Sequence, residues 1–125
     1  MLGDKDIVAT LAVKDLQVAR QFYEDKLGLK PDPGKEAGVI TYTSGKSKVL
    51  VYVSQFAGTN KATAATWMAG DDVKGLAGTL KAKGVRFEHY DFPGAKRDGD
   101  VHLMGEVQAA WFKDPDGNIL ALVNG

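Results

Sequence analysis

The second half of this 125-residue chain repeats the pattern of its first half, and this repeat restricts the possible folds more than any other feature. In each half a strand-like run precedes an amphipathic helical segment and further strand-like runs. The helical positions align at a separation of 57 residues, pairing Asp15, Leu16, Ala19 and Tyr23 with Asp72, Val73, Leu76 and Leu80. A unit of this kind buries its open face only against its twin. The sequence therefore predicts one domain, residues 1–125, made of two modules, residues 6–56 and 62–124.

The order of elements follows from local patterns. Residues 7–13 and 62–69 are predicted to be the first strand of each module. A helix follows each strand, capped by Asp15 in the first module and by Asp71 or Asp72 in the second, and ending near Gly28 and Gly84. Further strands are predicted at residues 38–43, 48–53, 85–91, 107–113 and 118–123, with turns at SGKS and DPDG. Residues 91–106 are rich in glycine and charge, and we expect them to form a loop.

Composition excludes several classes of site. The chain has no cysteine, which excludes disulfides and thiolate metal ligands. Sixteen basic residues balance sixteen acidic ones, so nothing indicates a surface for nucleic acid or an anionic membrane. No apolar run approaches the roughly 20 residues of a membrane span, and the N-terminus lacks the basic start of a signal peptide. We therefore expect a cytoplasmic protein whose partner is a small molecule.

Two stretches resemble one known superfamily. VKDLQVARQFYEDKLGLKP (13–31), which follows a strand, and WFKDPDGNILALV (111–123) are similar to the vicinal oxygen chelate (VOC) superfamily. This group includes glyoxalase I, fosfomycin- and bleomycin-resistance proteins and extradiol dioxygenases. The resemblance implies an α+β fold in which two tandem βαβββ modules form a half-open, barrel-like sheet around one cavity, with the helices outside. It also implies a homodimer, often with the cavities built across the subunit contact.

The resemblance further implies where a metal would be bound. Metal-dependent members take ligands from the first and last strands of each module, at positions that correspond here to Val8, Val51, Ala65 and Ala121. Open transition-metal sites usually need at least three protein ligands with imidazole, carboxylate, carbonyl or thiolate donors. Neither these positions nor their immediate neighbours contain His, Asp or Glu. The sequence therefore predicts no metal and no cofactor.

Alternation of side chains along the strands predicts the cavity wall. If Ala121 faces inward, Trp111 lies opposite it in the last hairpin and also faces inward. The other residues assigned to the wall are Val8, Thr10, Thr41, Val51, Ala65 and Trp67, whereas Ile40, Tyr42, Leu50 and Tyr52 are assigned to the helix side. Two indoles beside small side chains predict a slot for a flat, largely apolar ligand. The alternative is that both indoles are core residues that fill the space of a lost metal site.

The charged and imidazole side chains near residues 88–106 allow a second hypothesis. His102 with Glu106 and Glu88 could form an acid–base pair or a displaced metal site. We expect solvated surface positions for them instead, and the same for His89. The predicted loop is nevertheless long for a compact domain. We hypothesise that it closes over the cavity, with Arg97, His102 or Glu106 reaching a polar end of the ligand.

Three functions are compatible with these features. The first is a metal-independent small-molecule binding protein, similar to the resistance proteins that sequester a drug. The second is a VOC enzyme (a lyase, isomerase or dioxygenase-like protein) with a non-standard or absent metal site. The third is a regulatory or partner-binding module, which would present an exposed apolar patch.

Overall fold

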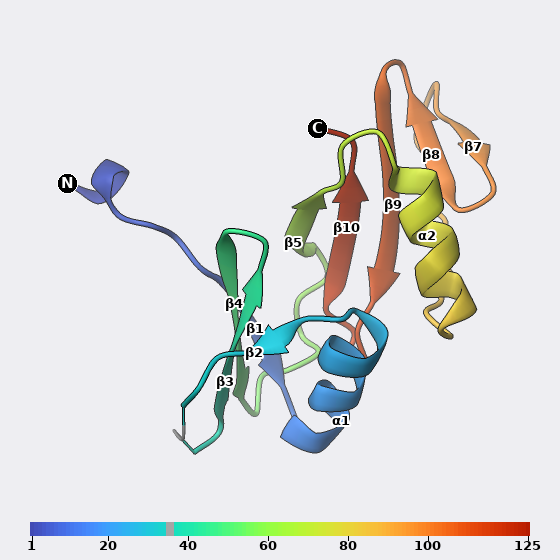
Figure 1. The fold of residues 1–125 in the computed structure, drawn as a ribbon. Coiled ribbons are helices and arrows are strands. Elements are labelled where there is room, and N and C mark those ends of the chain that lie inside the picture. The colour runs from blue at the N-terminus through green and yellow to red at the C-terminus, as the bar shows by residue number, and fades with distance from the viewer. Residues whose placement is uncertain (35–36) are drawn as a thin grey trace.

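The computed structural model describes residues 1–34 and 37–125, and it contains two separate β-sheets with helices packed against them (Figure 1). The strands are β1 (Ala9–Val13), β2 (Lys30–Pro31), β3 (Val39–Ser44), β4 (Ser47–Val53), β5 (Thr63–Met68), β6 (Phe87–Glu88), β7 (Lys96–Asp98), β8 (Val101–Met104), β9 (Val107–Lys113) and β10 (Ile119–Val123). The helices are η1 (Leu2–Asp4), α1 (Leu16–Arg20), η2 (Gln21–Lys26) and α2 (Val73–Ala82). This α+β architecture agrees with the predicted fold class, and the described residues form no closed barrel.

Sheet A has the strand order β1-β4-β3-β2 and comes from the first half of the chain. The predicted cap of its helix is confirmed, because Asp15 Oδ1 accepts the backbone N–H groups of Gln17 (2.8 Å) and Val18 (3.4 Å). α1 continues into η2, a π-helical turn in which the Leu27 N–H donates to the Phe22 carbonyl at 3.0 Å. The helical segment ends at Gly28, whose φ of 76° only glycine adopts readily.

Sheet B has the order β5-β10-β9-β8-β7, with β6 also pairing with β9, and comes from the second half. α2 begins after Asp72, although the Asp72 side chain makes no cap hydrogen bond. The predicted strand at 85–91 is reduced to the two residues of β6. The predicted loop at 91–106 is wrong in part, because β7 and β8 form a hairpin there and β8 pairs with β9. β7 is charged and fully exposed, and its segment is rich in glycine, so no apolar alternation marks it as a strand.

The buried core lies on the helix-covered faces of both sheets and is continuous between them. Phe22 on η2 lies 5.1 Å from Tyr23 and 6.3 Å from Phe112 on β9, measured between ring centroids. Tyr23 also stacks on Tyr42 of β3 at a centroid distance of 6.0 Å. This contact confirms the prediction that Tyr42 lies on the helix side of its sheet. Aromatic side chains from both halves thus share one core, which fixes the two sheets relative to each other.

A polar joint connects the two halves where the β9–β10 turn meets the start of α1. The buried Asp114 carboxylate accepts the Tyr23 hydroxyl at 2.6 Å and the Asn118 side-chain amide at 2.7 Å. The same amide donates to the Ala12 carbonyl on β1 at 2.7 Å. Burial and the adjacent Asp114 carboxylate raise the pKa of Tyr23 far above its usual value. The DPDG turn therefore ties the sheets together, in addition to reversing the chain.

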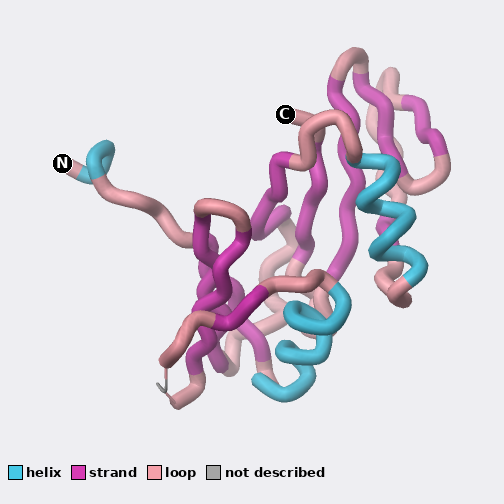
Figure 2. Tube along the Cα trace, in the orientation of Figure 1, coloured by secondary structure: helices cyan, strands magenta, loops and turns pink. Residues whose placement is uncertain are grey.

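The first eight residues differ from the rest of the chain because they extend away from both sheets (Figure 2). All eight are exposed, and Ile7 is 93% exposed. None of the helices formed by residues 1–34 and 37–125 has the length and apolar character that crossing a membrane requires.

Candidate functional site: the open face of sheet B

The strand register of sheet B decides which residues share its two faces. Ala121 on β10 pairs with Trp111 on β9 and with Thr66 on β5, so these three side chains point to the same side. The neighbouring pairs place Phe112 and Leu122 on the side that α2 covers. The prediction that Trp111 lies opposite Ala121 is confirmed. We call the side turned away from α2 the open face.

Trp67 does not lie on the open face. It pairs with Leu122 on β10, and its ring stacks on Phe112 with a centroid distance of 6.3 Å. Its indole N–H donates to Ser44 Oγ of the β3–β4 hairpin at 2.9 Å. The predicted sandwich of Trp67 and Trp111 is therefore wrong, because sheet B separates the two indoles. Ala65 pairs with Leu120 and shares the helix side, so its predicted facing is wrong as well.

On sheet A the predicted facing is right for the threonines and wrong for Val51. Thr10 on β1 and Thr41 on β3 both pair with Leu50 on β4, so these three residues share the face away from the helix. Val51 pairs with Leu11 and is fully buried on the helix side. The inferred facing of Leu50 and Tyr52 is reversed for the same reason. Val8 precedes β1 and is 37% exposed.

Turn length explains the error at Val51. The β3–β4 turn joins paired Ser44 and Ser47, so Lys48 pairs with Thr43, whereas the longer β9–β10 turn pairs Ile119 with Lys113. The first strands of the two hairpins (β3 and β9) align at a separation of 70 residues, but their second strands (β4 and β10) align at a separation of 71. Leu50, and not Val51, is therefore equivalent to Ala121. A slip of one residue exchanges the two faces of a strand.

An aromatic cluster surrounds Trp111 on the open face. The rings of His102, Tyr90 and Phe92 lie 5.0, 5.4 and 5.5 Å from the Trp111 ring, centroid to centroid. A broad groove of about 750 Å³ runs beside this cluster, and we call it the Trp111 groove. Its lining includes Lys61, Glu88, Tyr90, Phe92, Trp111 and Ile119. One wall of the groove is therefore aromatic and its rim is charged.

His102 is a structural part of this cluster. It is 1% exposed, which overturns the predicted solvated position. Its Nε2 accepts the Tyr90 backbone N–H at 2.9 Å, and its Nδ1 lies 3.3 Å from the Ala109 carbonyl, an acceptor. These partners require the tautomer with the proton on Nδ1. Both ring nitrogens are engaged, so His102 holds the Tyr90–Phe92 segment in place and has no free lone pair for a metal.

The polar residues of these hypotheses lie around the aromatic cluster. Arg97 is exposed on β7, where it pairs with His102 and lines a hollow of about 280 Å³ with His102, Tyr90 and Phe92, whereas Glu106 is exposed in the turn between β8 and β9. Glu88 forms an ion pair with Lys113 at 3.3 Å on the rim of the Trp111 groove. Arg97 and His102 therefore lie side by side, whereas Glu106 is not among the residues that line their hollow, and closure of this segment over a ligand stays a prediction.

His89 belongs to a surface ion pair at the edge of sheet B. Its Nε2 lies 2.7 Å from Asp100 Oδ1, and Lys81 approaches the same carboxylate at 3.4 Å. The hydrogen bond from His89 is the largest cause that holds the pKa of Asp100 below its usual value. The pair links the β7–β8 hairpin to α2.

The residues at the family's metal positions do not fit a metal. The register replaces Val51 by Leu50 and places Thr66 beside Ala121, but neither side chain is an imidazole or a carboxylate. Among residues 1–34 and 37–125, no group of three or more His, Asp or Glu side chains is arranged to hold a metal ion. The described residues therefore lack the donor set that such a site needs.

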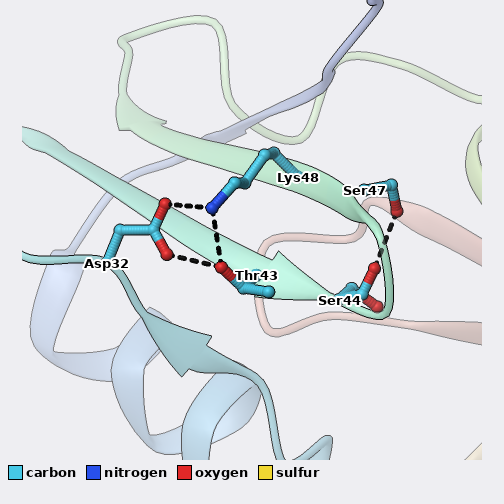
Figure 3. Close-up of polar contacts among 5 residues, drawn as sticks. All are labelled: Asp32, Thr43, Ser44, Ser47 and Lys48. Carbon is cyan, nitrogen blue, oxygen red and sulfur yellow. Dashed lines mark hydrogen bonds and ion pairs between the residues drawn. The ribbon is translucent and has the colours of Figure 1, made fainter.

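A second polar cluster lies on the outer edge of sheet A (Figure 3). Lys48 Nζ donates to Asp32 at 2.6 Å and to Thr43 at 2.8 Å, and Thr43 donates to Asp32. The hydrogen bond from Lys48 is the largest cause that lowers the pKa of Asp32. Every group in the cluster has a partner, which indicates a brace for the β3–β4 hairpin that carries Ser44.

Comparisons with known proteins identify the class of protein to which this two-sheet α+β fold belongs. Residues 7–122 match the Glyoxalase/Bleomycin resistance protein/Dioxygenase superfamily, so the chain belongs to this family. No curated protein sequence matches the chain.

Solved structures share the fold at low sequence identity. An integron cassette protein from the mobile metagenome of the Halifax Harbour sewage outfall has a TM-score of 0.72 at 18% identity, covering 97% of this chain and 99% of the other. Lactoylglutathione lyase from Agrobacterium tumefaciens has a TM-score of 0.71 at 19% identity, covering 96% and 92%. A fosfomycin resistance protein from Listeria monocytogenes, complexed with Mn(II) and sulfate, has a TM-score of 0.72 at 16% identity, covering 100% and 92%.

Sequence reasoning missed Tyr90 and Phe92 as neighbours of Trp111. Both belong to VRFEHYDF, where an alternating aromatic pattern could have indicated a segment packed on one face. The Tyr90 hydroxyl is buried and has no hydrogen-bond partner among the described residues.

Proposed function

We propose that this chain is a metal-independent small-molecule binding protein of the glyoxalase/bleomycin-resistance type. Its ligand is a flat, largely apolar molecule that stacks in the Trp111 groove. The observation that carries the proposal is the aromatic cluster on the open face, where Trp111, Tyr90 and Phe92 lie next to a groove of ligand size. The absence of His, Asp and Glu from the family's metal positions supports binding without a metal.

A single indole wall supports only part of the affinity. Burying one aromatic ring contributes about 1.5–3 kcal/mol, whereas a micromolar dissociation constant corresponds to about 8 kcal/mol. The remainder requires further contacts across the open groove. The buried Tyr90 hydroxyl, which lacks a described partner, can donate to a ligand oxygen if the ring moves slightly.

A homodimer would supply these contacts. The open face of sheet A presents Thr10, Thr41 and Leu50, and the exposed segment 1–8 carries apolar side chains such as Ile7. We propose that sheet A of a second copy covers the Trp111 groove, in a protein located in the cytoplasm. Sedimentation at micromolar concentration should show a dimer, and a monomer would contradict this arrangement.

Tryptophan fluorescence tests the binding proposal directly, because Trp111 reports on the groove. In a Trp67→Phe variant, aromatic antibiotics and metabolites should be screened for quenching of Trp111 in the presence of a chelator. At least one flat ligand should bind with micromolar affinity, and Trp111→Ala should weaken that binding at least tenfold, as truncation of a stacking residue does. A screen that produces no ligand for the groove would reject the proposal.

The alternative is a VOC enzyme with a non-standard metal site, and the fold it shares with a lactoylglutathione lyase motivates this alternative. Metal analysis of freshly purified protein separates the two functions. A stoichiometric transition metal that is lost on Glu106→Gln or His102→Gln would favour the enzyme. Protein that binds its ligand equally well before and after chelation would favour the binding protein.

A further inference from the structure

A second hollow lies on the other side of sheet B, and it is separate from the Trp111 groove. It has a volume of about 260 Å³ and lies between the end of η2, the helix α2 and the strands below them. We call it the helix-side pocket, and its wall includes Lys26, Leu27, Trp67, Leu76, Leu80 and Lys83. Most of this wall is apolar, and both halves of the chain contribute to it.

Two lysines bring positive charge to one end of this apolar pocket. Lys26 ends η2, and Lys83 follows the last residue of α2. Lys26 Nζ lies 3.7 Å from the point where a Cβ on Gly84 would stand, next to Lys83. Neither lysine forms an ion pair within residues 1–34 and 37–125, so both ammonium groups are available to a ligand. An apolar wall with unpaired ammonium groups at its end complements an amphiphilic anion.

The π-helical turn η2 provides an independent indication that this place is specialised. π-helical turns are rare and frequently occur at functional sites, because the wider turn redirects side chains. Here the turn closes with the Leu27 N–H on the Phe22 carbonyl, and the two residues at its end, Lys26 and Leu27, line the pocket. The equivalent helix α2 contains no such turn and is α-helical from Val73 to Ala82.

We propose that the helix-side pocket binds a small carboxylate with an apolar body, such as a short aliphatic or a single-ring aromatic acid. The apolar part lies against Trp67, Leu76 and Leu80, and the carboxylate pairs with Lys26 and Lys83. The volume lies below the range of about 300–1,000 Å³ that is typical of drug-sized ligands, which restricts the ligand to a small acid. This site is distinct from the ligand of the Trp111 groove, since sheet B separates the two.

An NMR titration of the isotope-labelled wild-type protein with octanoate tests the proposal, because the two tryptophan indole N–H signals report on opposite faces of sheet B. Octanoate should shift the Trp67 signal and leave the Trp111 signal unchanged. Lys26→Met and Lys83→Met should each weaken octanoate binding by up to about fivefold, the size expected for one exposed charge pair. Octan-1-ol, which has the same chain without the charge, should bind more weakly and be insensitive to both substitutions.

Lys81→Met is the matched control, since Lys81 lies on the same helix outside the pocket and should leave octanoate binding unchanged. Leu76→Glu, at an exposed position of the wall, should abolish octanoate binding without unfolding the protein. Three results would overturn the proposal: no Trp67 shift at millimolar octanoate, equal affinity for octan-1-ol, or a response of Trp111 alone. Lysine variants that lower the melting temperature but not the affinity would also overturn it, because they would show that the lysines only stabilise the helix ends. The fluorescence screen of the Trp111 groove can fail or succeed independently of these outcomes.

Discussion

Strands β1-β4-β3 of sheet A and β5-β10-β9 of sheet B have the same order, yet the two sheets present different chemistry on the faces turned away from their helices. Sheet A presents Thr10, Thr41 and Leu50, with Tyr52 as the aromatic residue of β4 on the same face. Sheet B presents Trp111, and the segment that contains Tyr90 and Phe92 packs against it. The two sheets thus share a three-strand arrangement, whereas the additional residues between α2 and β9 place aromatic rings beside Trp111 in sheet B.

The two sheets are also stabilised by different polar contacts. In sheet A the hairpin is braced by the surface cluster of Asp32, Thr43 and Lys48. In sheet B the buried His102 fixes the segment above Trp111. A third connection, centred on Asp114, joins the two sheets. These three sites allow the comparison to be tested, from the largest expected effect to the smallest.

Substitution of Asp114, which connects the two sheets, should cause the largest loss of stability. Asp114→Ala removes a buried carboxylate that accepts hydrogen bonds from Tyr23, from Asn118 and from the Asp116 backbone. Its donors would remain buried without partners, and we expect a loss of about 3 kcal/mol in the free energy of unfolding. Urea denaturation measures this loss. Asp116→Ala on the same turn is the control and should cost clearly less; equal losses would show that the turn, rather than the joint, is affected.

The second largest loss of stability is expected for substitution of His102, which fixes the aromatic segment on sheet B. His102→Ala removes both hydrogen bonds of a fully buried imidazole and leaves the Tyr90 N–H without an acceptor, at a cost of about 2–3 kcal/mol. The neighbouring His89→Ala should cost at most about 1 kcal/mol, because His89 is exposed and makes a surface pair. Hydrogen exchange should accelerate at Tyr90 in the first variant only. If the two variants are equally stable, His102 does not fix the segment.

The contact between Trp67 and sheet A should have a smaller effect. Trp67→Phe keeps an aromatic ring against Phe112 but removes the hydrogen bond to Ser44, and we expect a loss of about 1 kcal/mol in unfolding free energy. Ser44→Ala should produce a similar loss, and the double variant should not add a second one, because both remove one bond. Thermal and urea unfolding of the three variants form a double-mutant cycle. Full additivity would contradict the contact.

Substitution of the surface carboxylates Asp32 and Asp100 should cause the smallest loss of stability, and this loss should depend on pH. The pKa of Asp32 in sheet A and that of Asp100 in sheet B are both lowered, each chiefly by a hydrogen bond from a basic side chain. A lowered pKa means that each carboxylate stabilises the fold above the unfolded value of about 3.9, and that this contribution disappears as the pH falls through the lowered folded value.

Asp32→Asn and Asp100→Asn should therefore destabilise the protein slightly at pH 7. Both should match the wild type in strong acid, where the wild-type carboxylates are protonated. Urea midpoints measured along a pH series test this expectation. A difference that persists or grows in acid would contradict the assigned ion pairs.

Much of the architecture could be predicted from the sequence because it is specified locally. The cap at Asp15, the left-handed glycines Gly28 and Gly84, and the pairing of Lys113 with Ile119 all follow from neighbouring residues. The family resemblance extends these local signals to the whole fold, and the match over residues 7–122 confirms it. The sequence also shows that no alignment shift of one residue introduces a His, Asp or Glu at the metal positions.

The composition of the site was decided by tertiary structure. Trp67 and Val51 were assigned to the wrong faces because a difference of one residue in a turn or a strand start reverses the alternation along a strand. A loop is expected at residues 91–106 because β8 is stabilised by pairing with β9, and β7 by pairing with β8, and no local pattern encodes the contact with β9. The sequence thus determined the two helical segments, most of the strands and the side chains at the family's metal positions. Only the packing of the strands decided that the two indoles lie on opposite faces, since the register of a sheet depends on hydrogen bonds between distant segments.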